Sequence, residues 1–202
     1  LERMTETVSA PSIVPQKASG GTKFFYGFGS VAYGVAGIAL ASSLLTPYMN
    51  RVMHLPALWV GTVLMLTLML DAVIDPMIGQ FSDNLRTRWG RRHPLLYVSG
   101  PLIAIAVVLF WNSPVGQSET MKWVYLIGTL ILMRVTVSLY EVPSSALAPE
   151  LAPDYHDRTS VLSYRYFFGV IGGLVMTVIL YRVYLTPANG GMLNPAGYGS
   201  YA

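Results

Sequence analysis

Two aspartates lie inside an otherwise apolar segment of this 202-residue chain, where ionised groups are uncommon. Asp71 and Asp75 are four residues apart, so on a helix their carboxylates occupy one face, about one turn from each other. Placing an isolated ionised carboxylate in hydrocarbon costs about 3 kcal/mol on insertion scales. We therefore expect this pair to face an aqueous cavity or to hold a proton or a cation.

A second apolar segment carries further polar groups on one helix face. Arg134, Ser138 and Glu141 have i, i+4, i+7 spacing. One interpretation is that Arg134 forms a buried ion pair with Asp71 or Glu141 and only fixes the helix register. However, the chain has three intramembrane acids for one or two arginines, and this excess of acid favours a cation site. Carboxylates that share a cavity repel one another, which suits them to take up and release a proton or an alkali ion.

Arg165 lies within a third apolar segment, about two turns from its expected inner end at Arg158. The guanidinium group carries several N–H donors and stays charged in proteins. We expect Arg165 either to pair with one of the acids or to hold oxygen atoms of a substrate.

The composition indicates the class of protein that positions these groups. Hydrophobic residues make up 53% of the chain and charged residues only 11%, against about 25% charged in soluble domains. This excludes a disordered chain and argues against a soluble enzyme. The lack of cysteine excludes disulfides and thiolate metal sites, and the 13 Lys and Arg residues are too scattered for a nucleic-acid-binding face. We expect an all-α membrane protein with no cofactor and no nucleic-acid partner.

Five apolar segments have the roughly 20 residues that a helix needs to cross a bilayer. The predicted transmembrane bundle covers 24–184, with helices at about 24–48, 58–81, 94–111, 123–148 and 157–184. Residues 1–23 form a polar tail, and 185–202 form a loop rich in Gly, Asn, Pro and Tyr. Because an odd number of helices ends abruptly, we expect a fragment of a larger bundle.

The loop between the second and third segments sets the expected topology. It carries four arginines, Arg86, Arg88, Arg91 and Arg92. The positive-inside rule places such a loop in the cytoplasm. The tail 1–23 is then cytoplasmic and the loop 185–202 extracytoplasmic. The expected location is the inner (plasma) membrane of a bacterium.

Small residues on the first and fifth segments predict close helix packing. They are Ser30, Gly34, Gly37 and Ala41 on the first segment, and Gly169, Gly172 and Gly173 on the fifth. These positions define packing faces rather than chemistry.

Three stretches of the chain together resemble one known family. The first runs from DAVIDP at 71–76 through Gly79 and Asp83 to RWGRRHP at 88–94. The others are EVP at 141–143 and YRYFF at 164–168. Over about 26–173 the chain resembles the glycoside-pentoside-hexuronide:cation symporters, the melibiose permease-like family of the major facilitator superfamily.

The resemblance implies a major facilitator fold of two six-helix halves, of which this chain supplies five helices of the N-terminal half. It also implies a secondary active transporter rather than an enzyme. Such a protein moves a sugar, a glycoside or a similar small polar solute together with a proton or a sodium ion by alternating access. Its implied partners are the solute, the coupling cation, the lipid bilayer and the missing C-terminal half. No metal is implied beyond a sodium ion.

The resemblance also implies roles for particular residues. The expected cation-binding residues are Asp71, Asp75, Glu141 and Ser138, with Arg134 as an intramembrane charge partner. The expected solute-binding residues are Arg165, Tyr33, Tyr26 and Ser145. The expected cytoplasmic gate loop contains Gly79, Asp83, Arg88, Gly90, Arg91 and Arg92. In this loop we expect Asp83 to pair with Arg88, Arg91 or Arg92. The alternative is that the arginines only enforce the topology.

Three positions depart from the family pattern. Ile74 stands where the sodium-using relative has an asparagine, which removes an oxygen ligand and favours a proton over sodium. Gly34 and Ser145 stand where the family has a sugar-binding aspartate and a sugar-stacking tryptophan. The galactoside pocket is therefore not reproduced. A different sugar, a glycoside and an amphipathic lipid-like solute are all retained as candidates.

Two other functions compete with transport. An intramembrane aspartyl enzyme places its two acids on separate helices, whereas Asp71 and Asp75 share one, and the three histidines form no His-Glu metal motif. A non-transporting sensor or scaffold would keep the fold without the ion-binding role of the acids.

Overall fold

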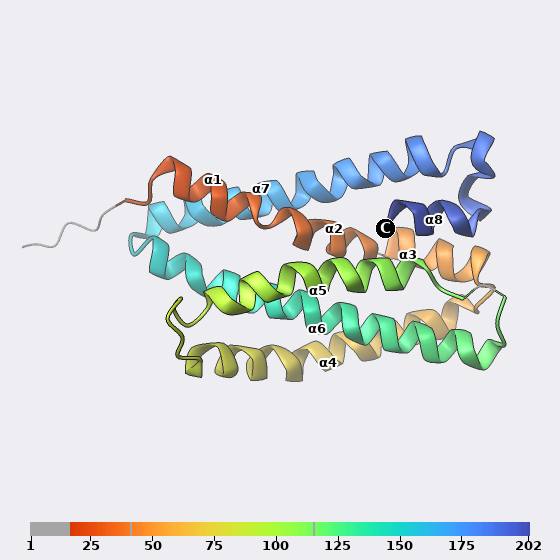
Figure 1. Cartoon of the computed structure of the whole chain (residues 1–202), viewed down its shortest axis with the longest axis horizontal. Coiled ribbons are helices and arrows are strands. Elements are labelled where there is room, and N and C mark those ends of the chain that lie inside the picture. The colour runs from red at the N-terminus through yellow and green to blue at the C-terminus, as the bar shows by residue number, and fades with distance from the viewer. Residues whose placement is uncertain (1–16, 41, 115) are drawn as a thin grey trace, which may run out of the picture.

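The computed structural model describes residues 17–40, 42–114 and 116–202. Most of the predicted tail and the small residue Ala41 therefore lie outside the described residues. Within the described part the regular structure is entirely helical (Figure 1). Five stretches are long and apolar enough to cross a membrane, as the sequence predicts: Gly20–Leu40, Ala57–Asn84, His93–Trp111, Glu119–Leu151 and Tyr155–Tyr184.

The helices follow one another along the chain in this order. The first span contains α1 (Gly20–Phe28) and α2 (Val31–Leu40), followed by α3 (Ser42–Pro47) and the π-helical turn η1 (Tyr48–Val52). The next three spans are α4 (Ala57–Asn84), α5 (His93–Trp111) and α6 (Glu119–Leu151). The last span is α7 (Tyr155–Ile179) with the π-helical η2 (Leu180–Tyr184). The 3-10 turns η3 (Pro187–Asn189) and η4 (Gly191–Leu193) then lead to α8 (Pro195–Tyr201).

The helix ends differ from those predicted by hydropathy because polar caps set them. Ser19 caps α1, with its side chain accepting from the Thr22 amide, so helix begins inside the segment predicted as tail. Ser118 and Asp154 likewise start α6 and α7 before their apolar stretches begin. Asn194 caps α8, so the predicted loop 185–202 contains a helix.

The first span is also interrupted, where the sequence predicts one continuous helix over 24–48. α1 ends at Phe28, and the Ser30 amide turns back to the Gly27 carbonyl before α2 begins. Gly29 lies in this turn, and glycine is a poor helix former because its backbone loses more conformational freedom on ordering. Despite the break, the two helices belong to one membrane-length stretch, Gly20–Leu40.

The spans form two groups of helices that lie along each other (Figure 1). In the α7 group, α7 packs along α1 and α2. In the α6 group, α6 packs along α4 and α5. The contacts between the two groups are much less extensive than those within each group. Residues that join the two groups are therefore of particular interest for function.

The α7 group is held by direct backbone contact between α2 and α7. A Cβ atom added to Gly34 would overlap the carbonyl oxygen of Gly169. A Cβ on Gly173 would lie 2.5 Å from Cγ1 of Ile38. Gly37, only one turn from Gly34, has open space around it. The predicted close packing of these two helices is therefore confirmed. The contact is made at Gly34 and Gly173 but not at Gly37.

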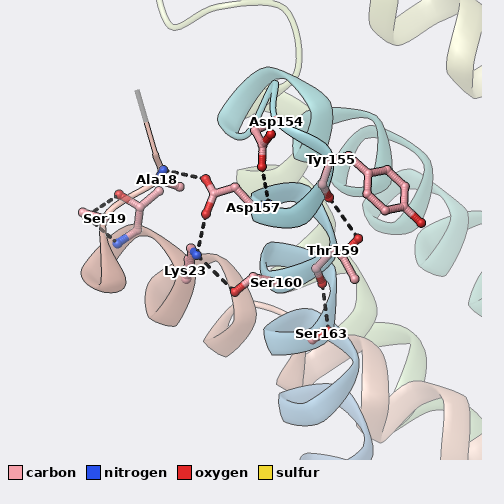
Figure 2. A network of polar contacts seen from close by, with 10 residues as sticks. Ala18, Ser19, Lys23, Asp154, Tyr155, Asp157, Thr159, Ser160 and Ser163 are labelled. Atoms are coloured by element: carbon pink, nitrogen blue, oxygen red, sulfur yellow. Dashed lines mark hydrogen bonds and ion pairs between the residues drawn. The ribbon is translucent and has the colours of Figure 1, made fainter. Parts of the chain in front are cut away.

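An ion pair anchors the beginning of α1 to the beginning of α7 (Figure 2). Lys23 Nζ lies 2.6 Å from Asp157 Oδ1, and the aspartate side chain is only 4% exposed. The Ala18 amide donates to the other oxygen of Asp157 at 2.7 Å, and Lys23 also donates to Ser160 Oγ at 3.1 Å. On sequence alone, Lys23 falls in the polar tail and Asp157 at the start of the fifth segment. The sequence did not indicate that the two residues pair.

An aromatic cluster holds α8 against the opposite end of the bundle. The rings of Tyr198 and Trp111 stack with centroids 5.3 Å apart, and Tyr48 lies 4.6 Å from Tyr198. Burial raises the pKa of Tyr198 to about 12, and its hydroxyl donates to the Met192 carbonyl at 3.1 Å. The hydroxyl therefore stays protonated at neutral pH.

The two neighbouring glycines of α2 give a stability prediction. Gly34→Ala forces the backbones of α2 and α7 apart, so we expect it to lower the free energy of unfolding by about 1–3 kcal/mol. Gly37→Ala meets open space and is the matched control, for which we expect no loss. Thermal unfolding of the full-length protein in lipid nanodiscs measures both. Equal effects of the two variants would contradict the assigned contact.

Candidate functional site

The intramembrane charges form two separate pairs. Arg134 Nη1 lies 3.1 Å from Asp71 Oδ2, and Arg165 Nη2 lies 3.7 Å from Glu141 Oε1. The described residues contain no group of three or more His, Cys, Asp and Glu side chains that could hold a metal ion. α6 thus presents its two charged residues, Arg134 and Glu141, to different neighbouring helices.

The first pair joins α4 to α6 with little access to solvent. Both side chains, Asp71 and Arg134, are less than one-fifth exposed. Among the described residues, Asp71 Oδ1 and Arg134 Nε are buried without a hydrogen-bond partner, as is Asp75 Oδ1 one turn further along α4. Ser138 is buried on α6. This pair has the geometry of the ion pair that fixes register, and it leaves Asp75 as the acid without an ion-pair partner among the described residues.

The second pair, Arg165 and Glu141, is joined by Tyr33. The three residues form a junction between the α7 group and the α6 group. Tyr33 of α2 donates its hydroxyl to Glu141 Oε1 at 3.0 Å, and the same oxygen is the one nearest to Arg165. The Arg165 guanidinium carbon lies 5.5 Å from the ring centroids of both Tyr33 and Tyr166. Arg165 is only 2% exposed, whereas Glu141 is 39% exposed.

This junction borders a cavity of about 300 Å³ between α2 and α7. Arg165 and the two tyrosines, Tyr33 and Tyr166, provide its polar and aromatic wall. Glycines and aliphatic side chains of α2 and α7 provide the rest. Sequence reasoning missed Tyr166, although its position directly after Arg165 in the YRYFF motif is a signal that could have indicated it.

The other two predicted solute residues lie outside the cavity wall. Tyr26 donates its hydroxyl to the Ser144 carbonyl at 2.7 Å and so fastens α1 to α6. Ser145 is exposed on α6, and its hydroxyl donates to the Val142 carbonyl of its own helix at 2.9 Å. A further link that the sequence did not indicate is the 3.2 Å hydrogen bond between the hydroxyls of Ser30 and Tyr140.

The arginine loop is held at one end of the bundle mainly by Arg92. Its guanidinium lies 3.0 Å from Asp83 at the end of α4 and 3.2 Å from Glu150 at the end of α6. Arg92 also donates to the Ala146 carbonyl. Of the three arginines considered for Asp83, the structure places Arg92 beside it. Arg92 therefore joins the α4–α5 connection to α6.

The remaining residues of the expected gate loop have different surroundings. Arg91 pairs with Glu150 at 3.2 Å, and Arg88 lies 5.3 Å from the ring centroid of Trp89. Gly90 has a φ of 94°, a left-handed conformation that favours glycine. Gly79 lies on α4, where an added Cβ would make an ordinary contact with Val142.

The five membrane-length helices and their buried charges define a multi-pass integral membrane protein. The family described as MFS/sugar transport protein matches residues 25–200. The chain belongs to this family.

Its relatives include proteins named as symporters. It is 32% identical over 175 residues to the uncharacterized symporter sll1374 of Synechocystis, covering 84% of this chain and 32% of that protein. It is 31% identical over 157 residues to the putative glycoside/cation symporter YagG of Escherichia coli, covering 78% and 34%. It is 31% identical over 159 residues to the sodium-dependent lysophosphatidylcholine symporter 1 of Gallus gallus, covering 78% and 30%. The chain thus spans about a third of the length of these relatives.

The two aspartates of α4 should respond oppositely to neutralisation. Asp71→Asn removes the partner of a largely buried arginine, so we expect the free energy of unfolding to fall by about 1–3 kcal/mol. Asp75→Asn removes a charge that has a buried oxygen without a hydrogen-bond partner, so stability should stay the same or rise. Equilibrium unfolding of both variants in mixed micelles makes the comparison. A similar loss in both would argue against the pairing of Asp71 with Arg134.

Proposed function

We propose that the chain is the N-terminal helical part of a secondary active transporter, which couples a proton or a sodium ion to the movement of a sugar, a glycoside or a similar small polar solute. The observation that carries this proposal is the buried Arg165 at the wall of a cavity, 3.7 Å from an acid on the other helix group. A charged group held at such depth marks a substrate or ion pathway in membrane proteins more often than a packing contact.

The acids of α4 are proposed to carry the coupling ion, with Asp75 as the principal one. Arg134 already compensates the charge of Asp71, so Asp75 has the greater need of a proton or cation. Ile74 beside it contributes no oxygen ligand, which favours a proton over sodium. The buried hydroxyl of Ser138 is the proposed neutral member of this site.

Alternating access is proposed to use the contact of Arg92 with Asp83 and Glu150. These pairs hold the arginine loop against α6, and their separation would allow that end of the bundle to open. A C-terminal half would supply the opposite wall of the cavity. We place the arginine loop and the N-terminus in the cytoplasm on the basis of the charge distribution. We propose a bacterial inner membrane because two of the relatives named above are bacterial.

A second candidate function is transport of an amphipathic solute on the same fold. The mostly apolar cavity wall favours it, as does the similarity to a symporter named for lysophosphatidylcholine. A non-transporting sensor remains distinguishable from both, because it would not accumulate solute against a gradient.

Uptake by the full-length protein in proteoliposomes tests transport. We expect accumulation of at least one sugar, glycoside or lysophospholipid under an imposed proton gradient, and a loss of about tenfold or more in Asp75→Asn. Solute exchange without a gradient should persist in that variant because the cavity is intact. Glu119→Gln, an exposed acid at the far end of α6, is the matched control with unchanged uptake. Full gradient-driven accumulation by Asp75→Asn would contradict the role of this acid.

A further inference from the structure

Arg165 is a buried guanidinium whose donors are only partly used by the described residues. Its side chain is 2% exposed, and its Nε and Nη2 are buried with no hydrogen-bond partner. The rings of Tyr33 and Tyr166, each 5.5 Å from the guanidinium carbon, hold it in place by cation–π contact. A buried guanidinium needs a counter-charge and acceptors for its fork of donors.

Glu141 supplies the charge for this arginine without supplying the hydrogen bond. The distance of 3.7 Å between Glu141 Oε1 and Arg165 Nη2 exceeds that of a hydrogen bond. The same oxygen already accepts from Tyr33, and the glutamate is 39% exposed. Glu141 therefore has Tyr33 and its own exposure to water as polar contacts without Arg165, whereas Nε and Nη2 of the buried arginine have no hydrogen-bond partner among the described residues.

The cavity in front of Arg165 suits an apolar body rather than a polyhydroxylated one. Beyond the arginine and the two tyrosines it is lined by glycine backbone and by Ile38, Val170 and Leu174. Hydroxyl groups placed against these aliphatic side chains would lose hydrogen bonds to water without replacement. This part of the cavity, about 300 Å³, has room for about one ring, and the exposed Val170 and Leu174 leave it open on their side.

We propose that the solute taken by this cavity carries a carboxylate on a small apolar body. Its carboxylate binds the guanidinium of Arg165 where this group lines the cavity and replaces Glu141 as the counter-charge, while Glu141 stays with Tyr33 and solvent. This inference rests on the proposed transport function for its physiological meaning, and for the same site it favours the second candidate, an amphipathic solute, over a sugar. It is independent of which ion drives transport.

Benzoate and benzamide are the probes, because they share a ring and differ in charge. We expect benzoate to bind the full-length protein in lipid nanodiscs at neutral pH about tenfold or more tightly than benzamide, measured by calorimetry, as one charge-assisted contact to arginine requires. Acetate, which has the charge without the ring, should bind more weakly than benzoate. Equal binding of benzoate and benzamide, or binding of neither, would overturn the proposal.

Variants of Arg165 and Glu141 test whether the solute carboxylate replaces Glu141 as the counter-charge or whether these residues are only structural. Arg165→Gln should abolish the preference for benzoate over benzamide. Glu141→Gln removes the competing carboxylate, so benzoate should bind several-fold more tightly; weaker binding there would contradict the proposed replacement. If Arg165→Gln fails to fold, the increase in benzoate affinity of Glu141→Gln still tests the proposal. Glu119→Gln, on the same helix as Glu141 but at its other end, should leave the benzoate affinity unchanged.

The outcomes distinguish this inference from the proposed transport function. Gradient-driven uptake of a neutral solute without a preference for benzoate would leave transport standing and remove the anionic solute class. The opposite outcome is a preference for benzoate that changes in Arg165→Gln and Glu141→Gln as expected, in a protein without gradient-driven uptake. That outcome would support the binding site and contradict transport.

Discussion

The close approach of α2 and α7 is the constraint on which the candidate site depends. It exists because Gly34 has no side chain, so its backbone can contact that of Gly169. Tyr33 directly precedes Gly34, and Arg165 lies one turn before Gly169, so the same contact brings the tyrosine ring to 5.5 Å from the guanidinium. A side chain at position 34, such as the aspartate that the family resemblance leads us to expect there, would therefore clash with the backbone of Gly169.

Polar contacts connect the two helix groups in addition to the apolar core that α2 shares with α5 and α6. Tyr33 reaches Glu141, Tyr26 reaches the Ser144 carbonyl, and Ser30 reaches Tyr140. Interhelical hydrogen bonds in membranes contribute about 0.6–2 kcal/mol each, less than the extensive packing within a group. We therefore expect relative movement to occur at this boundary and to preserve the packing of α7 with α1 and α2.

Hydropathy predicted the five spans because a bilayer demands long apolar helices, but it could not predict the break after Phe28 or the helix starts set by Ser118 and Asp154. The charged residues were likewise found by their rarity in apolar segments. Periodicity assigns residues to a face of one helix, yet it does not say which faces meet. The partners of Arg134 and Arg165, and the contribution of Tyr166, therefore needed the three-dimensional arrangement.

The separation of the charges into two pairs has a mechanical consequence. α6 carries both Arg134 and Glu141, two turns apart, and presents one to α4 and the other to α7. A rotation or shift of α6 that changes one pair must alter the other, because a helix moves as a rigid unit over such a short length. Ion binding near Asp71 and solute binding at Arg165 would then bias the same movement. The two sites need not touch, and α6 is the element through which each would affect the other.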